Sequence, residues 1–178
     1  IFMSFVIGIS QGIQPIIGFN YGAAKYTRVR KTYLLALATA TALSFVAFGC
    51  FQLFPRQIIS VFGKGSELYF QFSERYFRIY MFLTLINGIQ PVTSNFFNSI
   101  GKSSLGVFMS LTRQILFLLP LIIVFPIFMG IDGVMYAGPI ADAATGIVCG
   151  IFTIRELKEL KTLSYTSENA AAASGSAN

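Results

Sequence analysis

Long stretches without charge dominate this sequence. Lys, Arg, Asp and Glu are all missing from residues 1–24, 32–55 and 79–101. Two further stretches carry one charge each, which is Arg113 within residues 104–127 and Asp142 within residues 133–154. A helix of about 20 mostly apolar residues is long enough to cross the ~30 Å hydrocarbon layer of a bilayer. The pattern therefore predicts five transmembrane helices, at about residues 1–24, 32–54, 79–101, 104–127 and 133–154.

The composition points to the same class. Hydrophobic residues make up 54% of the 178 residues and charged residues only 11%, which is too apolar for an ordinary soluble domain. We expect an all-α integral membrane protein with one bundle over residues 1–160. Residues 161–178 end in small and polar side chains and are expected to form a disordered tail. Ile1 already lies inside an apolar run without a charged leader, so we expect the chain to be a piece of a longer protein.

Several kinds of chemistry lack the residues that they need. The chain has no His, and Cys50 and Cys149 lie in different predicted spans, so we expect no metal site and no cofactor. An intramembrane enzyme needs a nucleophile with a base, or paired acids, and Asp142 has no partner acid in any span. The net charge of +6 does not indicate nucleic-acid binding, because cations beside apolar spans are explained by membrane orientation and by anionic lipid.

The cations also predict an orientation. Loops rich in Lys and Arg stay in the cytoplasm, which places the basic loop over residues 25–31 and the C-terminal tail on the cytoplasmic side. Alternation of the spans then puts eight cations inside and four outside, with Arg113 inside the membrane. We expect a multi-pass protein of the cell membrane. The outer connection over residues 55–78 mixes aromatic and charged residues, which is typical of an amphipathic helix at the interface.

Amide side chains recur inside the predicted spans. On a helix, residues three or four positions apart share a face, so Gln11 and Gln14 line up in the first span. Lipid cannot satisfy such groups, so they must face other helices or water. They either hydrogen-bond neighbouring helices or line a substrate cavity. The candidate cavity residues are Gln11, Gln14, Asn20, Asn87, Gln90 and Asn95.

Prolines accompany these amides, and the tetrapeptide GIQP occurs at both 12–15 and 88–91. Proline removes a backbone hydrogen bond and bends a helix, and such breaks occur at membrane depth in transporters. The candidate helix hinges are Pro15, Pro91, Pro120 and Pro139.

The two charges inside spans call for a partner. Counted from the predicted turns at 1.5 Å per residue, Arg113 and Asp142 each lie roughly 14–15 Å deep, close to the middle of the bilayer. An unpaired charge there costs at least ~2.5–3.5 kcal/mol on insertion scales. Three arrangements remain open: a permanent ion pair, an Arg113 side chain that reaches the inner surface, and a proton or cation switch at Asp142.

Four segments resemble one transporter family in the order in which they occur. They read GISQGIQPIIGFNYGAAKYTRVRK, FFNSIGKSSLGVF, LTRQILFLLPLIIVFP and GIDGVMYAGPIADAATGIV. Over residues 7–155 the sequence is similar to the multidrug and toxic compound extrusion (MATE) transporters. The resemblance implies most of one six-helix bundle, helices eight to twelve of a twelve-helix transporter, with the N-terminal half of the same transporter as its partner.

The resemblance also implies a function. Members of this family export drugs and organic cations through a central cavity by alternating access, in exchange for Na⁺ or H⁺. Some relatives are described with an acid on the helix that corresponds to residues 79–101, where this sequence has only amides and hydroxyls. A lipid-linked saccharide flippase of the same superfamily and a structural membrane subunit are the alternatives. The exported compound and the coupling ion stay open.

Overall fold

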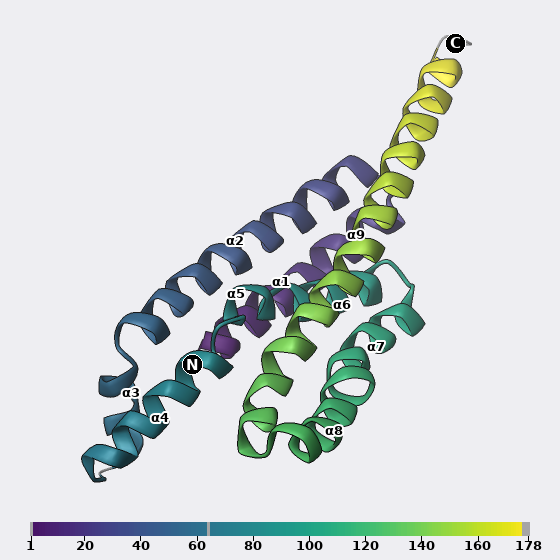
Figure 1. Ribbon diagram of the computed structural model, residues 1–178. Coiled ribbons are helices and arrows are strands. Elements are labelled where there is room, and N and C mark those ends of the chain that lie inside the picture. Colours follow the sequence, from purple (N-terminus) through teal and green to yellow (C-terminus); the bar gives the residue numbers. More distant parts are fainter. Residues whose placement is uncertain (1, 64, 176–178) are drawn as a thin grey trace.

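The chain folds into a bundle of helices (Figure 1). The structure is a computed structural model and describes residues 2–63 and 65–175. No strand occurs within these residues. The helices are α1 (Phe2–Gly22), α2 (Tyr26–Leu53), α3 (Pro55–Phe62), α4 (Glu67–Tyr80), α5 (Thr84–Asn87), α6 (Ile89–Ser99), α7 (Ser103–Leu111), the π-helix η1 (Thr112–Leu118), α8 (Leu119–Met129) and α9 (Ile131–Gly175). The expected all-α membrane fold is confirmed.

The first two spans follow the charge pattern. α1 and α2 are separated by a tight turn in which Ala24 has a positive φ of 55°. Both helices are long and apolar enough to cross a membrane, as are the combined segment Ser103–Met129 and the segment Ile131–Ser167. The third predicted span, residues 79–101, is absent from this set because its helix is interrupted.

The third predicted span is broken in two places. α4 ends at Tyr80, α5 has only four residues, and α6 begins at Ile89. The second break lies at Gly88, which packs against α2 so closely that an added Cβ would be 2.8 Å from Ser44 Oγ and 3.3 Å from the Ala40 carbonyl oxygen. The span expected over residues 79–101 is therefore helical, but it is divided among the end of α4, α5 and α6. The interfacial helix expected over 55–78 is likewise two helices, α3 and α4.

The fourth predicted span changes its winding midway. α7 passes into the π-helix η1, which passes into α8, and Pro120 is the second residue of α8. The Leu119 N–H donates to the Gln114 carbonyl, five residues back, at the end of the π-helical segment. π-helical turns are rare in proteins, and those that occur inside α-helices often lie at functional sites.

The last helix is longer than the sequence predicted. α9 continues from Ile131 to Gly175, so the disordered tail expected over residues 161–178 is not seen for residues 161–175. Residues 176–178 lie outside the described part of the chain. Leu160 is only 1% exposed and packs against the core, and the alanines at 170–173 are strong helix formers, so the helix has no reason to stop at the membrane surface.

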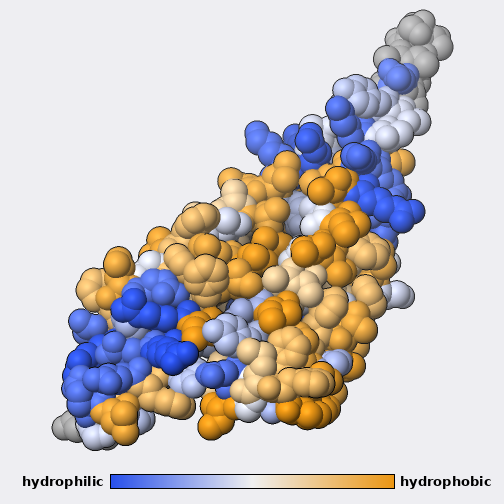
Figure 2. All heavy atoms as spheres, in the orientation of Figure 1, coloured by the Kyte–Doolittle hydropathy of each residue, from blue (hydrophilic) through white to orange (hydrophobic). Residues whose placement is uncertain are grey.

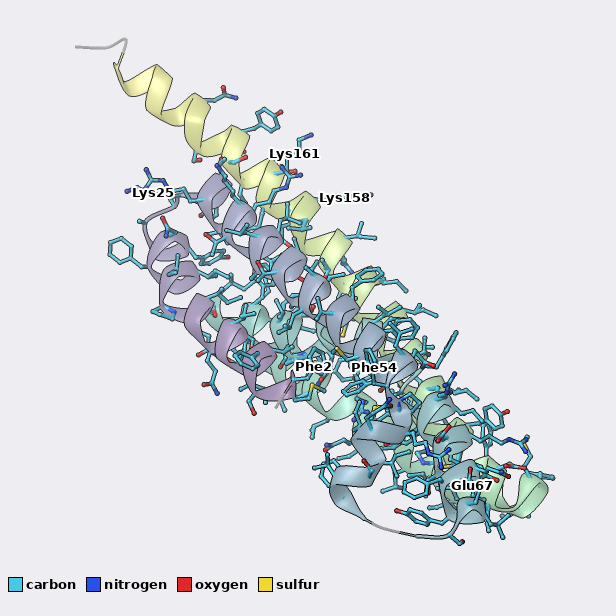
Figure 3. The ribbon with its side chains drawn as sticks, turned by 90° about the vertical axis from the view of Figure 1, so that its left-hand side faces the viewer. Phe2, Lys25, Phe54, Glu67, Lys158 and Lys161 are labelled. Carbon is cyan, nitrogen blue, oxygen red and sulfur yellow. The ribbon has the colours of Figure 1, made fainter. Side chains whose placement is uncertain are left out.

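The surface has the profile of a membrane protein. An apolar belt separates a hydrophilic region around α3 and α4 from a second hydrophilic region along the emerging part of α9 (Figure 2). Lys25, Lys158 and Lys161 lie at one end of the bundle and Glu67 at the other (Figure 3). The alternation of sides inferred from the loop cations agrees with this arrangement.

A buried hydroxyl cluster joins three helices at the core. Tyr33 of α2 is fully buried, and its hydroxyl lies 3.0 Å from Thr93 Oγ1 of α6 and 2.9 Å from Thr153 Oγ1 of α9. Its ring packs 4.2 Å from the ring of Phe96, measured between centroids. Buried hydroxyls must be paired to avoid a desolvation penalty, so the cluster fixes the positions of α2, α6 and α9 relative to one another.

Candidate functional site

Amide side chains connect α1 to α6 at membrane depth. Gln14 Nε2 donates to Asn95 Oδ1 at 2.6 Å, and Asn95 Nδ2 donates to Ser10 Oγ at 2.8 Å. Ser10 Oγ in turn donates to the Ile7 carbonyl at 2.9 Å. Gln14 and Asn95 are half-buried, while Ser10 is fully buried. We call Ser10, Gln14 and Asn95 the amide line.

A different face of α6 is bonded to α7. Gln90 Nε2 donates to the Met109 carbonyl at 3.2 Å, and Ser94 Oγ donates to the Gly106 carbonyl at 2.7 Å. The helices approach closely because Gly106 has no side chain, and a Cβ there would lie 2.9 Å from the Ser94 carbonyl oxygen. Small residues at such contacts are typical of helix packing in membranes. α6 therefore holds α1 and α7 together through polar groups.

Three of the six predicted cavity residues lie apart from this network, and one of them is Asn87 of α5. Gln11 is exposed on α1. Asn20 is half-buried, and its Nδ2 donates at 2.8 Å to the carbonyl of Ile16 in its own helix. The structure brings Gln14, Gln90 and Asn95 together around α6 and leaves Gln11, Asn20 and Asn87 outside.

The two charges inside the membrane meet. Arg113 Nε of η1 lies 2.5 Å from Asp142 Oδ1 of α9, with the side chains 20% and 4% exposed. The short helix α5, which carries Asn87, also packs against α9. α9 therefore meets both the π-helical segment, at this ion pair, and the interrupted third span.

Small residues of α9 make this meeting possible. A Cβ at Gly138 would lie 3.0 Å from Tyr80 Cδ2, and a Cβ at Gly146 would collide with the Ile86 side chain. Gly138, Asp142 and Gly146 are spaced four residues apart, so they lie on one face of α9. Sequence reasoning missed these glycines, although their spacing is the signal that would have found them.

The candidate hinges fall into two groups. Pro15 lies inside α1 and Pro139 inside α9, and both helices are continuous there. Pro91 follows the break at Gly88 by three residues, and Pro120 follows the last residue of the π-helical segment by two. Only the second pair therefore lies next to an irregular backbone.

An ionic cluster at one end of the bundle was not predicted. Lys102 Nζ lies 2.7 and 2.8 Å from the two carboxylate oxygens of Glu156, and 3.1 Å from Glu159 Oε2. Burial lowers the pKa of Lys102, but its hydrogen bonds to both glutamates outweigh this effect and raise the pKa above the usual value. The turn between α6 and α7 is thereby held against α9. Glu156 and Glu159 follow the last predicted span, which is why the span pattern did not reveal them.

The described residues offer no candidate metal centre, since no three acidic, Cys or His side chains among them gather closely enough to hold an ion. The polar groups inside the bundle are amides, hydroxyls and one ion pair. These groups can bind a solute by hydrogen bonds and can rearrange between helices, without bond-forming chemistry.

Comparisons with known proteins agree with this architecture. The MatE family model matches residues 1–131. Among solved structures, an outward-facing multidrug resistance MATE family transporter of the MOP superfamily matches with a TM-score of 0.80 at 18% identity, over 88% of this chain and 36% of that chain. The Vibrio cholerae MATE transporter VcmN in its bent form matches with a TM-score of 0.77 at 19% identity, over 89% and 36%. These two likenesses show the fold.

A structure described as protein A is 37% identical, with a TM-score of 0.78, over 86% of this chain and 35% of that chain. No curated protein sequence matches the chain. The chain thus spans about a third of the length of the solved proteins that it matches.

Proposed function

The chain belongs to the MatE family of membrane transporters, and from this premise we propose that it forms the C-terminal bundle of an efflux transporter for drugs and organic cations. The transporter works by alternating access and is driven by antiport of Na⁺ or H⁺. The N-terminal half of the same protein supplies the opposite wall of the cavity, and the full transporter lies in the cell membrane.

The amide line is the observation that carries the proposal. Gln14, Asn95 and Ser10 form a chain of polar groups between α1 and α6, and α6 begins directly after a helix break. Broken helices at membrane depth are tolerated where they face protein or a water-filled cavity, and in transporters they form substrate sites. Uncharged amides suit a substrate that carries its own positive charge, because no fixed cation repels it.

The charge inventory disfavours the saccharide flippase. A cavity that accepts an anionic lipid-linked head group needs several cations, and Arg113 is the one cation within the five predicted spans. Its guanidinium is already paired with Asp142. No contact in the bundle favours that second function over efflux.

Removal of individual amides tests the cavity. In the full-length transporter, Gln14→Ala and Gln90→Ala each remove a hydrogen bond between helices or to substrate. One such bond contributes about 0.6–2 kcal/mol of free energy. We expect the apparent affinity for an exported dye such as ethidium to change about 3- to 30-fold, with near-normal protein in the membrane. The measurement is dye efflux from cells, normalised to folded transporter.

Gln57→Ala is the matched control, because Gln57 is an exposed amide on α3 outside this network. It should leave efflux unchanged. If Gln14→Ala and Gln90→Ala lower the amount of folded protein but leave efflux per molecule unaltered, the amides only hold the helices together and the cavity proposal fails.

The proposed orientation is tested by labelling. We expect cysteines placed at Thr27 and Ser103 to react with an impermeant maleimide only from the cytoplasmic side, and one at Ser66 only from outside. All three residues are exposed, and native Cys50 and Cys149 are first replaced by Ser. The loop cations predict this result through the positive-inside rule. Reaction of Thr27→Cys from outside in intact cells would reverse the orientation.

A further inference from the structure

One end of the bundle carries a surplus of exposed cations. Seven Lys and Arg side chains are exposed there: Lys25, Arg28, Arg30, Lys31, Arg155, Lys158 and Lys161. Among the described side chains, none of the seven forms a salt bridge, because Glu156 and Glu159 are both engaged by Lys102. Arg56, at the other end, is instead paired with Glu67. Among the described side chains, these cations are therefore free to attract an anion.

Two of these cations, Arg30 and Lys161, line a groove between α2 and α9. Its walls are Tyr26, Thr27 and Arg30 of α2, and Lys161, Ser164 and Tyr165 of α9, around a cavity of about 200 Å³. Leu160, which also lines the groove, is almost completely buried and belongs to the apolar core. The groove thus has a polar, cationic rim above an apolar base.

The rim has the chemistry of a phosphate site. A guanidinium offers a planar set of N–H donors that matches phosphate oxygens, and an ammonium adds a compact positive charge. Lys161 Nζ lies 5.9 Å from the centre of the Tyr165 ring, which limits the positions that this long side chain adopts. The hydroxyl of Thr27 supplies a further hydrogen-bond donor.

The position of the groove favours a lipid over a soluble anion. Lys25, Lys158 and Lys161 lie where α2 and α9 leave the apolar belt (Figures 2 and 3). Leu34 lies one turn from Arg30 on the same face of α2, and Ile154 lies two turns from Lys161 on the same face of α9. Both are exposed apolar residues on the membrane side of the rim. Tyrosines are common at this depth, where head groups meet acyl chains.

We propose that this groove binds the phosphate head group of an anionic phospholipid, with the acyl chains along the apolar faces that contain Leu34 and Ile154. The unpaired cations select an anionic lipid over a zwitterionic one, since each cation near the surface attracts negative charge. The site is separate from the amide line, so it holds whether or not the transport proposal does.

The test uses the full-length transporter in nanodiscs of phosphatidylcholine with increasing phosphatidylglycerol. Native mass spectrometry measures how much phosphatidylglycerol stays bound after release. Arg30→Gln combined with Lys161→Gln should reduce its retention roughly tenfold. Arg155→Gln combined with Lys158→Gln removes the same charge at the same end but outside the groove, and should change retention little. Both variants should melt like the parent in phosphatidylcholine alone, because all four side chains are exposed.

Two results would overturn the site. Equal loss of phosphatidylglycerol in both double variants, or no loss in either, would mean that the cations attract lipid only diffusely.

A second experiment uses inorganic phosphate in place of lipid. If phosphate raises the melting temperature of the transporter in detergent as much as phosphatidylglycerol does, and the Arg30 and Lys161 variant abolishes both effects, the groove binds a soluble anion and the lipid assignment is wrong. Should the double variant not fold, Lys161→Gln alone is measured against Lys158→Gln.

Discussion

Asp142→Asn and Arg113→Gln, made one at a time, are each expected to lower the free energy of unfolding by about 3–5 kcal/mol. Each change leaves the remaining charge buried and unpaired, and the two side chains are only 4% and 20% exposed. The double variant removes both charges, so it should lose less stability than the two single variants do together. The measurement is reversible unfolding of the purified full-length transporter in mixed micelles with increasing SDS.

An exposed ion pair provides the control. Arg56 and Glu67 lie 2.7 Å apart, but their side chains are 53% and 61% exposed. Arg56→Gln and Glu67→Gln should therefore leave stability close to that of the parent. If Asp142→Asn and Arg113→Gln both unfold and transport like the parent, the buried pair has no role in stability or coupling.

The same variants separate a fixed ion pair from a switch. A fixed pair ties the π-helical segment to α9, so its loss reduces folding first and transport only as a consequence. A proton or cation switch at Asp142 would give an Asp142→Asn protein that folds normally and moves substrate independently of the ion gradient. The contact of Arg113 with Asp142 leads us to expect the fixed pair.

Four of the five predicted spans coincide with described helices that are long and apolar enough to cross a membrane, because charge is excluded from hydrocarbon. The breaks were harder to predict. Pro15 and Pro139 suggested hinges by the same rule as Pro91, yet α1 and α9 run through them. The break at Gly88 coincides with its close contact with Ala40 and Ser44, and a single sequence does not reveal contacts between distant helices. The helix beyond residue 160 was missed because the small and polar composition of the tail indicated disorder. The alanines, which favour a helix, and the burial of Leu160 were given no weight in that prediction.

The candidate site was predictable in part. Helical spacing placed Gln14 and the third-span amides on polar stripes, but it did not identify Asn95 as the partner of Gln14. Depth alone suggested that Arg113 and Asp142 could meet, because two residues near the middle of the membrane have few other partners. The cluster of Lys102, Glu156 and Glu159 was missed because these residues lie outside the spans, where helix periodicity carries no information about partners.

Gradient-driven transport by the full-length protein tests the central claim most directly. Purified transporter is reconstituted into liposomes with an imposed Na⁺ or H⁺ gradient, and movement of ethidium is followed by fluorescence. We expect ethidium to accumulate against its own concentration gradient, far above the level in protein-free liposomes, in one of the two ion gradients. This accumulation should collapse when an ionophore removes that gradient. Movement no faster than in protein-free liposomes, or movement that ignores both gradients, would contradict efflux by antiport.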